Sequence, residues 1–160
     1  MPNEKYFPDE VRDDFVPKEV YYAQDFADLE AEKLWPYVWQ VACRAEEVPN
    51  VGDYVTYNIV EDSIVVIRSS ETEIKAFHNV CPHRARRLTE GTGNNKQFVC
   101  PFHGWRFGLD GRNIKVIDKG DWGGCLTDDD IRLSEVQCQT WGGFVFINMD
   151  ENAEPLIDFL

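Results

Sequence analysis

The sequence predicts a mainly β protein, a small antiparallel barrel or sandwich, with one short helix near the N-terminus. Many short apolar runs with strand-like alternation follow one another after residue 38, and polar or glycine-containing turns separate them. Only one stretch has helical periodicity. With 160 residues and 43% apolar residues, the chain is long enough to bury the core of one globular domain.

The N-terminal part precedes this β region. Residues 1 to about 24 are acidic and aromatic, which predicts an extended arm. A helix is expected next, with Asp25 as its N-cap, Phe26 and Leu29 on its apolar stripe, and Pro36 beyond its end. We expect this helix to cover one end of the domain.

The predicted strands are separated by turns at residues 49–53, 61–62, 70–73 and 109–111, and residues 118–130 read as a loop. The Asp128 to Asp130 run in that loop lacks the ligand spacing of a calcium loop and is interpreted as a solvated turn. The strands are expected at residues 39–43, 54–60, 63–69, 74–78, 98–99, 105–107, 114–117, 133–139 and 143–148.

Composition excludes several classes of function. A formal charge of -13 disfavours nucleic acid and anionic membranes as partners, because both bind clustered Lys and Arg. The N-terminus has no signal-peptide core, and no apolar run is long enough to span a membrane, so we expect a cytoplasmic protein. Outside the motif described next, Cys43, Cys125 and Cys138 form an odd remainder, which disfavours a disulfide scaffold.

Two short segments alternate cysteine and histidine. The first reads Cys81-Pro82-His83, and the second, sixteen residues later, reads Cys100-Pro101-Phe102-His103. Two thiolates and two imidazoles suit a structural zinc ion. Zinc fingers, however, keep their cysteines on one segment and their histidines on another, whereas a Rieske [2Fe-2S] cluster takes two cysteines on one iron and two histidines on the other. The alternating order therefore favours a Rieske cluster.

Neighbouring residues suit two tight loops around such a cluster. Prolines stiffen both segments, and Gly104 allows the backbone to turn closely around the sulfurs. Leu88, Phe102 and Trp105 are expected to keep water away from the thiolates.

The two motifs, Cys81-Pro82-His83-Arg84 and residues 100–105, resemble the Rieske motif in the N-terminal part of the large (alpha) subunit of aromatic-ring-hydroxylating oxygenases. Residues 48–53 and 141–147 share the resemblance. It implies antiparallel sheets with two ligand-bearing hairpin loops, and a [2Fe-2S] cluster with Gly104 and Trp105 next to its ligands. It also implies that Cys81 and Cys100 bind one iron and that His83 and His103 bind the other. One departure is Ala85, where the family often has glycine.

The resemblance also indicates the reduction potential of the cluster and the kind of protein that donates electrons to it. Rieske proteins of respiratory complexes carry two further cysteines that bridge the loops, and this chain has Arg86 and Phe102 in those places. Without the bridge we expect a potential of roughly -150 mV, which suits a ferredoxin or flavin reductase as donor. Arg84, Arg86 and Arg87 form a basic patch, which either pairs internally or docks an acidic donor or a neighbouring subunit.

A complete oxygenase of this family also needs a mononuclear iron bound by two histidines and a carboxylate. The chain has three histidines, and His78 alone is left after the cluster. We therefore expect an N-terminal arm and helix (1–38), a Rieske domain (39–150) and the start of a linker (151–160) to a catalytic domain that hydroxylates an aromatic or similar hydrophobic compound.

In the family, such alpha subunits form trimers, or hexamers with beta subunits. Two alternatives to an oxygenase part stay open at this stage. One is a stand-alone Rieske-type ferredoxin, and the other is a zinc-stabilised binding module.

Overall fold

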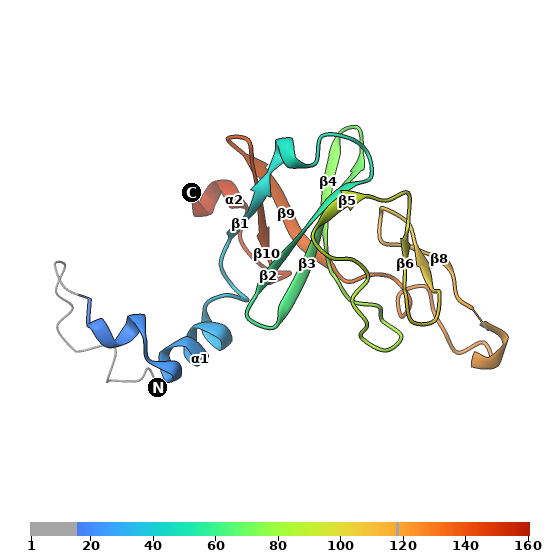
Figure 1. Ribbon diagram of the computed structural model, residues 1–160, viewed down its shortest axis with the longest axis horizontal. Coiled ribbons are helices and arrows are strands. Elements are labelled where there is room, and N and C mark those ends of the chain that lie inside the picture. Colours follow the sequence, from blue (N-terminus) through green and yellow to red (C-terminus); the bar gives the residue numbers. More distant parts are fainter. Residues whose placement is uncertain (1–15, 118) are drawn as a thin grey trace.

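The computed structural model describes residues 16–117 and 119–160, and it confirms a mainly β fold (Figure 1). Two antiparallel sheets make up the domain, one of seven strands in the order β1-β10-β9-β4-β3-β2-β5 and one of three in the order β6-β7-β8. The larger sheet contains β1 Gln40–Arg44, β2 Asp53–Ile59, β3 Asp62–Ser70, β4 Glu73–His78, β5 Thr92–Asn94, β9 Glu135–Trp141 and β10 Phe144–Asn148. The smaller contains β6 Phe98–Val99, β7 Arg106–Phe107 and β8 Asn113–Lys115.

The larger sheet curls into a half-barrel. Its strands β1 and β2 are separated by four other strands in the sheet order, yet the Tyr57 hydroxyl of β2 donates to Oε1 of Gln40 in β1 at 3.1 Å. This bond joins the two sides of the curled sheet. The hollow side of the sheet is filled by one apolar cluster, which includes Cys43, Val145 and Ile147.

Strand β3 is buried on both faces. Ile64 and Val66 belong to the cluster inside the half-barrel, whereas Val65 and Ile67 belong to the cluster on the other side of the sheet. All four side chains are fully buried. This two-sided burial explains why β3 reads as a continuous apolar run and does not alternate with polar residues.

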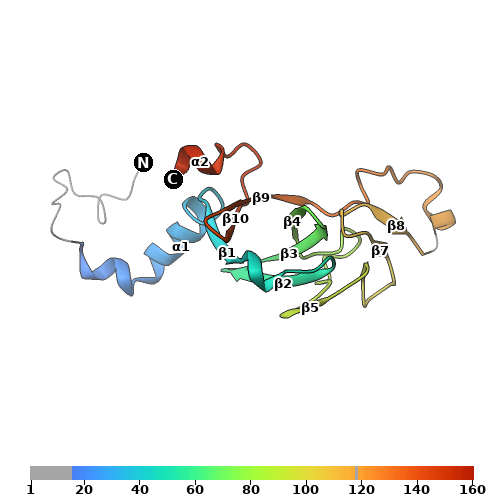
Figure 2. The same cartoon turned by 90° about the horizontal axis from the view of Figure 1, so that it is seen from above.

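The smaller sheet and its loops pack on the outer face of the larger sheet. Phe98 and Phe107 of the small sheet share one core with Val65 and Phe77 of strands β3 and β4. Figures 1 and 2 show the small sheet at the end of the molecule opposite helix α1. The second apolar cluster thus fixes the small sheet, which carries one of the two ligand loops, to the half-barrel.

The N-terminal helix differs from the prediction at its start. Helix α1 spans Gln24–Lys33, and Ala23 occupies the N-cap without a side-chain bond, so the prediction of Asp25 as N-cap is wrong. No residue of α1 is buried, and the expectation that it covers one end of the domain is therefore also wrong for the described residues. It is preceded by a 3₁₀ turn at Lys18–Tyr21, and residues 1–15 of the predicted arm lie outside the described residues.

One strand and one α-helix of the described residues were not predicted. Strand β5 consists of exposed Thr, Gly and Asn, and it forms only by pairing with Asp53–Val55 of β2. Helix α2 Leu156–Phe159 packs through buried Leu156 against Trp39 and Phe146. The predicted strand at 133–139 begins later, at Glu135, because the Leu133 amide donates to the Gly111 carbonyl at 2.9 Å instead. In the described part of the chain, no helix has the length and apolarity needed to cross a membrane.

Candidate metal centre

The two segments that carry the cysteines and histidines fold into loops with the same backbone hydrogen bonds. In the first, the Cys81 amide donates to the Arg86 carbonyl at 2.8 Å, and the Ala85 amide donates to the Cys81 carbonyl at 2.9 Å. In the second, the Cys100 amide donates to the Trp105 carbonyl at 2.8 Å, and the Gly104 amide donates to the Cys100 carbonyl at 3.0 Å. Each cysteine therefore opens a closed turn of the same length, and the histidine follows it by two residues in the first loop (His83) and by three in the second (His103).

Both turns close through a residue with left-handed backbone geometry. Gly104 has a φ of 70°, and Ala85, at the equivalent position of the first loop, has a φ of 51°. Glycine adopts this geometry freely, whereas alanine does so at a cost, because its Cβ crowds the backbone. Ala85 thus keeps the hydrogen-bond pattern of the Gly104 loop, but with a strained backbone.

The two cysteines lie side by side in the core. Cys81 is 1% and Cys100 is 3% exposed, and both share an apolar cluster with Leu88 and Trp105. Burial raises the pKa of Cys81 to about 11, and the neighbouring Cys100 thiol adds to the rise. A pair of buried thiols is poorly ionised without a cation, and a bound metal reverses this balance.

The two histidines form a second pair nearer the surface. Their ring centroids are 4.6 Å apart, and Trp105 stacks flat on His83 at 4.9 Å with an interplanar angle of 5°. Nδ1 of His83 is buried and has no hydrogen-bond partner. Burial, followed by the charges of His103 and Arg84, lowers the pKa of His83, which favours the neutral form of the ring. A neutral imidazole with an orphaned buried nitrogen is suited to bind a metal.

The donors are thus arranged as a sulfur pair and a nitrogen pair. Among residues 16–117 and 119–160, no three His, Cys, Asp or Glu side chains come close enough to hold one ion together. A tetrahedral zinc site gathers four ligands around one ion, while a Rieske cluster needs two ligands on each of two irons. The two pairs fit the second arrangement.

Phe102 does not lie where the sequence suggested. Its side chain is 57% exposed and stacks on His103 at 3.9 Å between centroids, so the expectation that it shields the thiolates is wrong. Trp105 and Leu88, by contrast, are buried in the core that holds both cysteines. Leu88 and Trp105, and not Phe102, are therefore the predicted residues that keep water from the two thiols.

A residue that contacts this centre and was absent from the sequence predictions is Trp122. It lies in the 3₁₀ turn Lys119–Trp122, and its ring meets His83 edge-on, at 5.6 Å and 75°. The surrounding loop is rich in Gly and Asp, which predicts turns and gives no packing pattern. A single tryptophan in such a loop is the one signal that it packs on something.

The arginine patch beside the centre forms no ion pair with another residue among 16–117 and 119–160. Arg84, Arg86 and Arg87 are all exposed, and none of them pairs with a carboxylate in the described part of the chain. Of the two readings of the patch, internal pairing thus has no support among these residues. All five cysteines are free, in agreement with the expectation that no disulfide scaffold forms.

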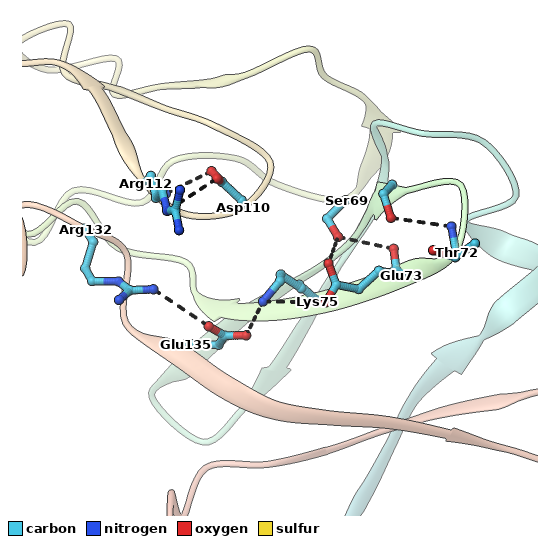
Figure 3. Close-up of polar contacts among 9 residues, drawn as sticks. Ser69, Thr72, Glu73, Lys75, Asp110, Arg112, Arg132 and Glu135 are labelled. Carbon is cyan, nitrogen blue, oxygen red and sulfur yellow. Dashed lines mark hydrogen bonds and ion pairs between the residues drawn. The ribbon is translucent and has the colours of Figure 1, made fainter.

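A second polar region lies away from this centre. A groove of about 640 Å³ is lined by residues of β4 and β9. Within it Lys75 donates to Glu135 at 2.6 Å, and Figure 3 shows these two side chains together with Arg132. Arg132 lies 3.9 Å from the same carboxylate. None of the paired cysteines and histidines lines this groove, so it is a separate feature of the surface.

Comparison with known proteins agrees with the site. Residues 38–121, more than half of the chain, match the Rieske [2Fe-2S] domain. The oxygenase subunit of carnitine monooxygenase from Escherichia coli (strain K12) is 36% identical over 151 residues, which are 91% of this chain and 39% of that protein. The large subunit of anthranilate 1,2-dioxygenase from Acinetobacter baylyi is 33% identical, over 91% of this chain and 31% of that protein.

Solved structures show the same relationship. A quaternary ammonium Rieske monooxygenase in complex with L-carnitine has a TM-score of 0.81 and 32% identity, over 90% of this chain and 41% of that chain. Naphthalene 1,2-dioxygenase from Rhodococcus sp. has a TM-score of 0.83 and 30% identity, over 90% of this chain and 33% of that chain. The chain spans about two fifths or less of the length of these relatives. It belongs to the Rieske [2Fe-2S] domain family, in the form found in oxygenase large subunits.

Proposed function

We propose that this chain is the electron-transfer domain of a Rieske non-haem iron oxygenase, with Cys81 and Cys100 as ligands of one iron and His83 and His103 as ligands of the other. The observation that carries the proposal is the pairing of two buried thiols and two imidazoles 4.6 Å apart on loops of identical backbone pattern. Such a cluster, when bound, accepts and releases one electron at a time.

The chain itself positions the cluster ligands, shields them from water and sets the net charge of the cluster. The left-handed turns at Ala85 and Gly104 close the two loops, each of which carries one cysteine and one histidine. Trp105 stacks on His83 from the core side and excludes water from that ligand. Because both imidazoles are neutral ligands, the centre carries less negative charge than one bound by four thiolates, and an added electron is less strongly repelled.

We further propose that electrons come from a ferredoxin or flavin reductase that docks at Arg84, Arg86 and Arg87. The guanidinium groups of this patch are exposed and pair with no carboxylate of the described residues, which supports the proposal, because the chain as a whole is strongly acidic, with a formal charge of -13. A local basic patch on an acidic protein steers an acidic partner to one place.

Stopped-flow reduction by a reduced acidic [2Fe-2S] ferredoxin tests this docking. Replacement of both Arg86 and Arg87 by Glu should slow reduction at low ionic strength. Added salt should reduce the difference in rate between this variant and the unmodified chain, because it screens the charges. The double reversal of Arg112 and Lys115 to Glu is the matched control, because it changes the net charge by the same amount and both side chains are exposed on the β7–β8 hairpin. Equal slowing by the control would show that only net charge matters, and unchanged rates for the double variant would refute the docking site.

The division into an N-terminal part (1–38), a Rieske domain (39–150) and a linker (151–160) belongs to the same proposal. In it, a mononuclear iron in a C-terminal domain uses the electrons to hydroxylate an aromatic or other organic compound, as the names of relatives acting on naphthalene, anthranilate and carnitine suggest. We propose a cytoplasmic assembly of alpha subunits, a trimer or a hexamer with beta subunits. The structure of one relative, a quaternary ammonium Rieske monooxygenase, is described as giving insight into inter-subunit electron transfer, which supports such an assembly.

The reading frame tests the oxygenase part of the proposal. An Asp-x-x-His-x-x-x-x-His-like stretch encoded downstream of Leu160 is the expected result, because two histidines and a carboxylate bind the mononuclear iron. A stop codon directly after Leu160 would refute the oxygenase and would indicate a separate electron carrier.

A further inference from the structure

Trp122 forms one side of an aromatic enclosure around His83. Trp105 covers one face of the imidazole, and Trp122 approaches it edge-on, while the two indole rings meet each other at 6.0 Å and 70°. The imidazole is therefore bounded on two sides by rings from different segments. His103 has a different neighbour, the exposed ring of Phe102.

The loop that carries Trp122 has few other attachments. Its neighbours Asp121, Gly123 and Cys125 are exposed, and Trp122 is half-buried against the core that holds the cysteines. The hydrogen bonds of this turn are local ones, such as the bond from the Cys125 amide to the Trp122 carbonyl at 3.1 Å. Packing of the indole, with help from half-buried Leu126, therefore attaches the loop to the domain.

This packing has a consequence for the ligand. The χ2 torsion angle of a histidine side chain has only broad energy minima, so the ring needs neighbours to hold its nitrogens in one orientation. A stack on one face fixes the ring plane but leaves its outer edge open to tilting and to water. Trp122 closes that edge, next to a ring whose Nδ1 is buried without a partner.

We infer that Trp122 is a positioning residue for the cluster, which holds the His83 imidazole in its ligating orientation and keeps water from this ligand. The inference rests on the proposed ligand set and adds a residue to it. Residues that orient metal ligands commonly alter metal affinity by about 10-fold or more when they are removed. The alternative is that Trp122 only fastens the loop, in which case the electronic properties of the cluster do not depend on it.

The test uses the full chain loaded with its cluster, in the unmodified form and as Trp122→Ala, Trp122→Phe and Trp141→Ala. Trp141→Ala is the matched control, because Trp141 is 53% exposed on the β9–β10 hairpin. Three quantities are measured: the electron paramagnetic resonance (EPR) g-values of the reduced cluster, its reduction potential, and the rate of iron loss to a chelator. Far-ultraviolet circular dichroism checks folding.

Trp122→Ala should shift the g-values, accelerate iron loss about 10-fold and raise the potential, because water stabilises the more negatively charged reduced cluster. Trp122→Phe should restore most of each property, and the control should match the unmodified chain. If Trp122→Ala does not fold, Trp122→Leu takes its place with the same expectations, because leucine keeps apolar bulk without a ring.

Unaltered g-values and potential in a folded Trp122→Ala or Trp122→Leu chain would overturn the inference, even if iron is lost faster. A failure of the unmodified chain to give a Rieske-type signal would overturn both the inference and the proposed ligand set. The two failures are thus distinguishable, because the first occurs only in a chain whose unmodified form carries the cluster.

Discussion

Replacement of Ala85 by glycine should stabilise the domain. Ala85 closes the first ligand loop with a φ of 51°, and Gly104 closes the second with a φ of 70°. Equivalent positions in two loops of the same hydrogen-bond pattern thus carry different residues. The pair allows the substitution to be made in both directions within one molecule.

The magnitude follows from two opposing contributions to the free energy of unfolding. Left-handed geometry costs an alanine about 1–2 kcal/mol, which Ala85→Gly removes. The added flexibility of glycine in the unfolded chain costs about 0.4–1 kcal/mol. The middle of the two ranges gives a net gain of about 0.8 kcal/mol. Gly104→Ala should lose a similar amount, because the nearest described side chain to an added Cβ is Ile117, at 3.5 Å, which is ordinary contact.

Thermal unfolding of the cluster-loaded chain, at one scan rate for all variants, measures the difference. For a domain of this size, 1 kcal/mol corresponds to about 2–4 °C in Tm. We expect Ala85→Gly to raise the apparent Tm by about 2 °C and Gly104→Ala to lower it by about as much. Ala31→Gly, in the last turn of helix α1 (Gln24–Lys33), is the control and should not raise Tm.

A fall in Tm for Ala85→Gly would refute the reasoning, because it would mean that Ala85 is not strained in the folded loop. A rise for both Ala85→Gly and Ala31→Gly would also count against it. In that case the gain would come from glycine itself and not from the backbone geometry of the ligand loop.

Three further predictions concern the core and its titration. Val65→Ala and Val66→Ala should each lower the free energy of unfolding, measured with denaturant, by about 2 kcal/mol. Only Val65→Ala should alter the EPR spectrum of the cluster, because Val65 shares a core with Cys81 and Cys100 whereas Val66 faces the other core. Equal spectra for the two variants would contradict the two-sided burial of β3. Gly111→Ala should cost more than 2 kcal/mol, because its Cβ would lie 2.5 Å from Cε1 of buried Phe77, and a smaller loss in the same assay would contradict that close approach. Burial raises the pKa of Cys43 to about 11 from an ordinary 9.0, so the stabilisation contributed by the neutral buried thiol is complete below pH 9 and declines above it. Between pH 8 and 10.5 the free energy of unfolding should fall by about 2 kcal/mol more in the unmodified chain than in Cys43→Ala. Parallel curves of unfolding free energy against pH for the two chains would refute the assignment.

The strands of the half-barrel were predictable where their own side chains define a pattern. β3 and β4 carry apolar residues that face two cores, and both were expected within one or two residues of their observed ends. β5 has no such pattern, because Thr92, Gly93 and Asn94 are exposed and are held only by β2. A strand that exists through its partner alone has no signal in its own residues.

The candidate site was predictable for a different reason. Its ligands are close in sequence within each loop, and their residue types restrict the metal chemistry strongly. Trp122 was not predictable, because it reaches His83 from a distant loop and no periodicity places it there. The strain at Ala85 was visible only as a departure from the family pattern, and its φ required the folded loop.

The proposed ligand set is tested most directly by electron-nuclear double resonance on the reduced chain, grown with ¹⁵N-labelled histidine. We predict a [2Fe-2S] signal with hyperfine coupling to two histidine nitrogens. One coupling should disappear in His83→Cys and the other in His103→Cys, or the cluster should be lost, while His78→Gln should keep both. A reduced cluster without histidine coupling, or a colourless chain that binds only zinc, would contradict the assignment of Cys81, His83, Cys100 and His103.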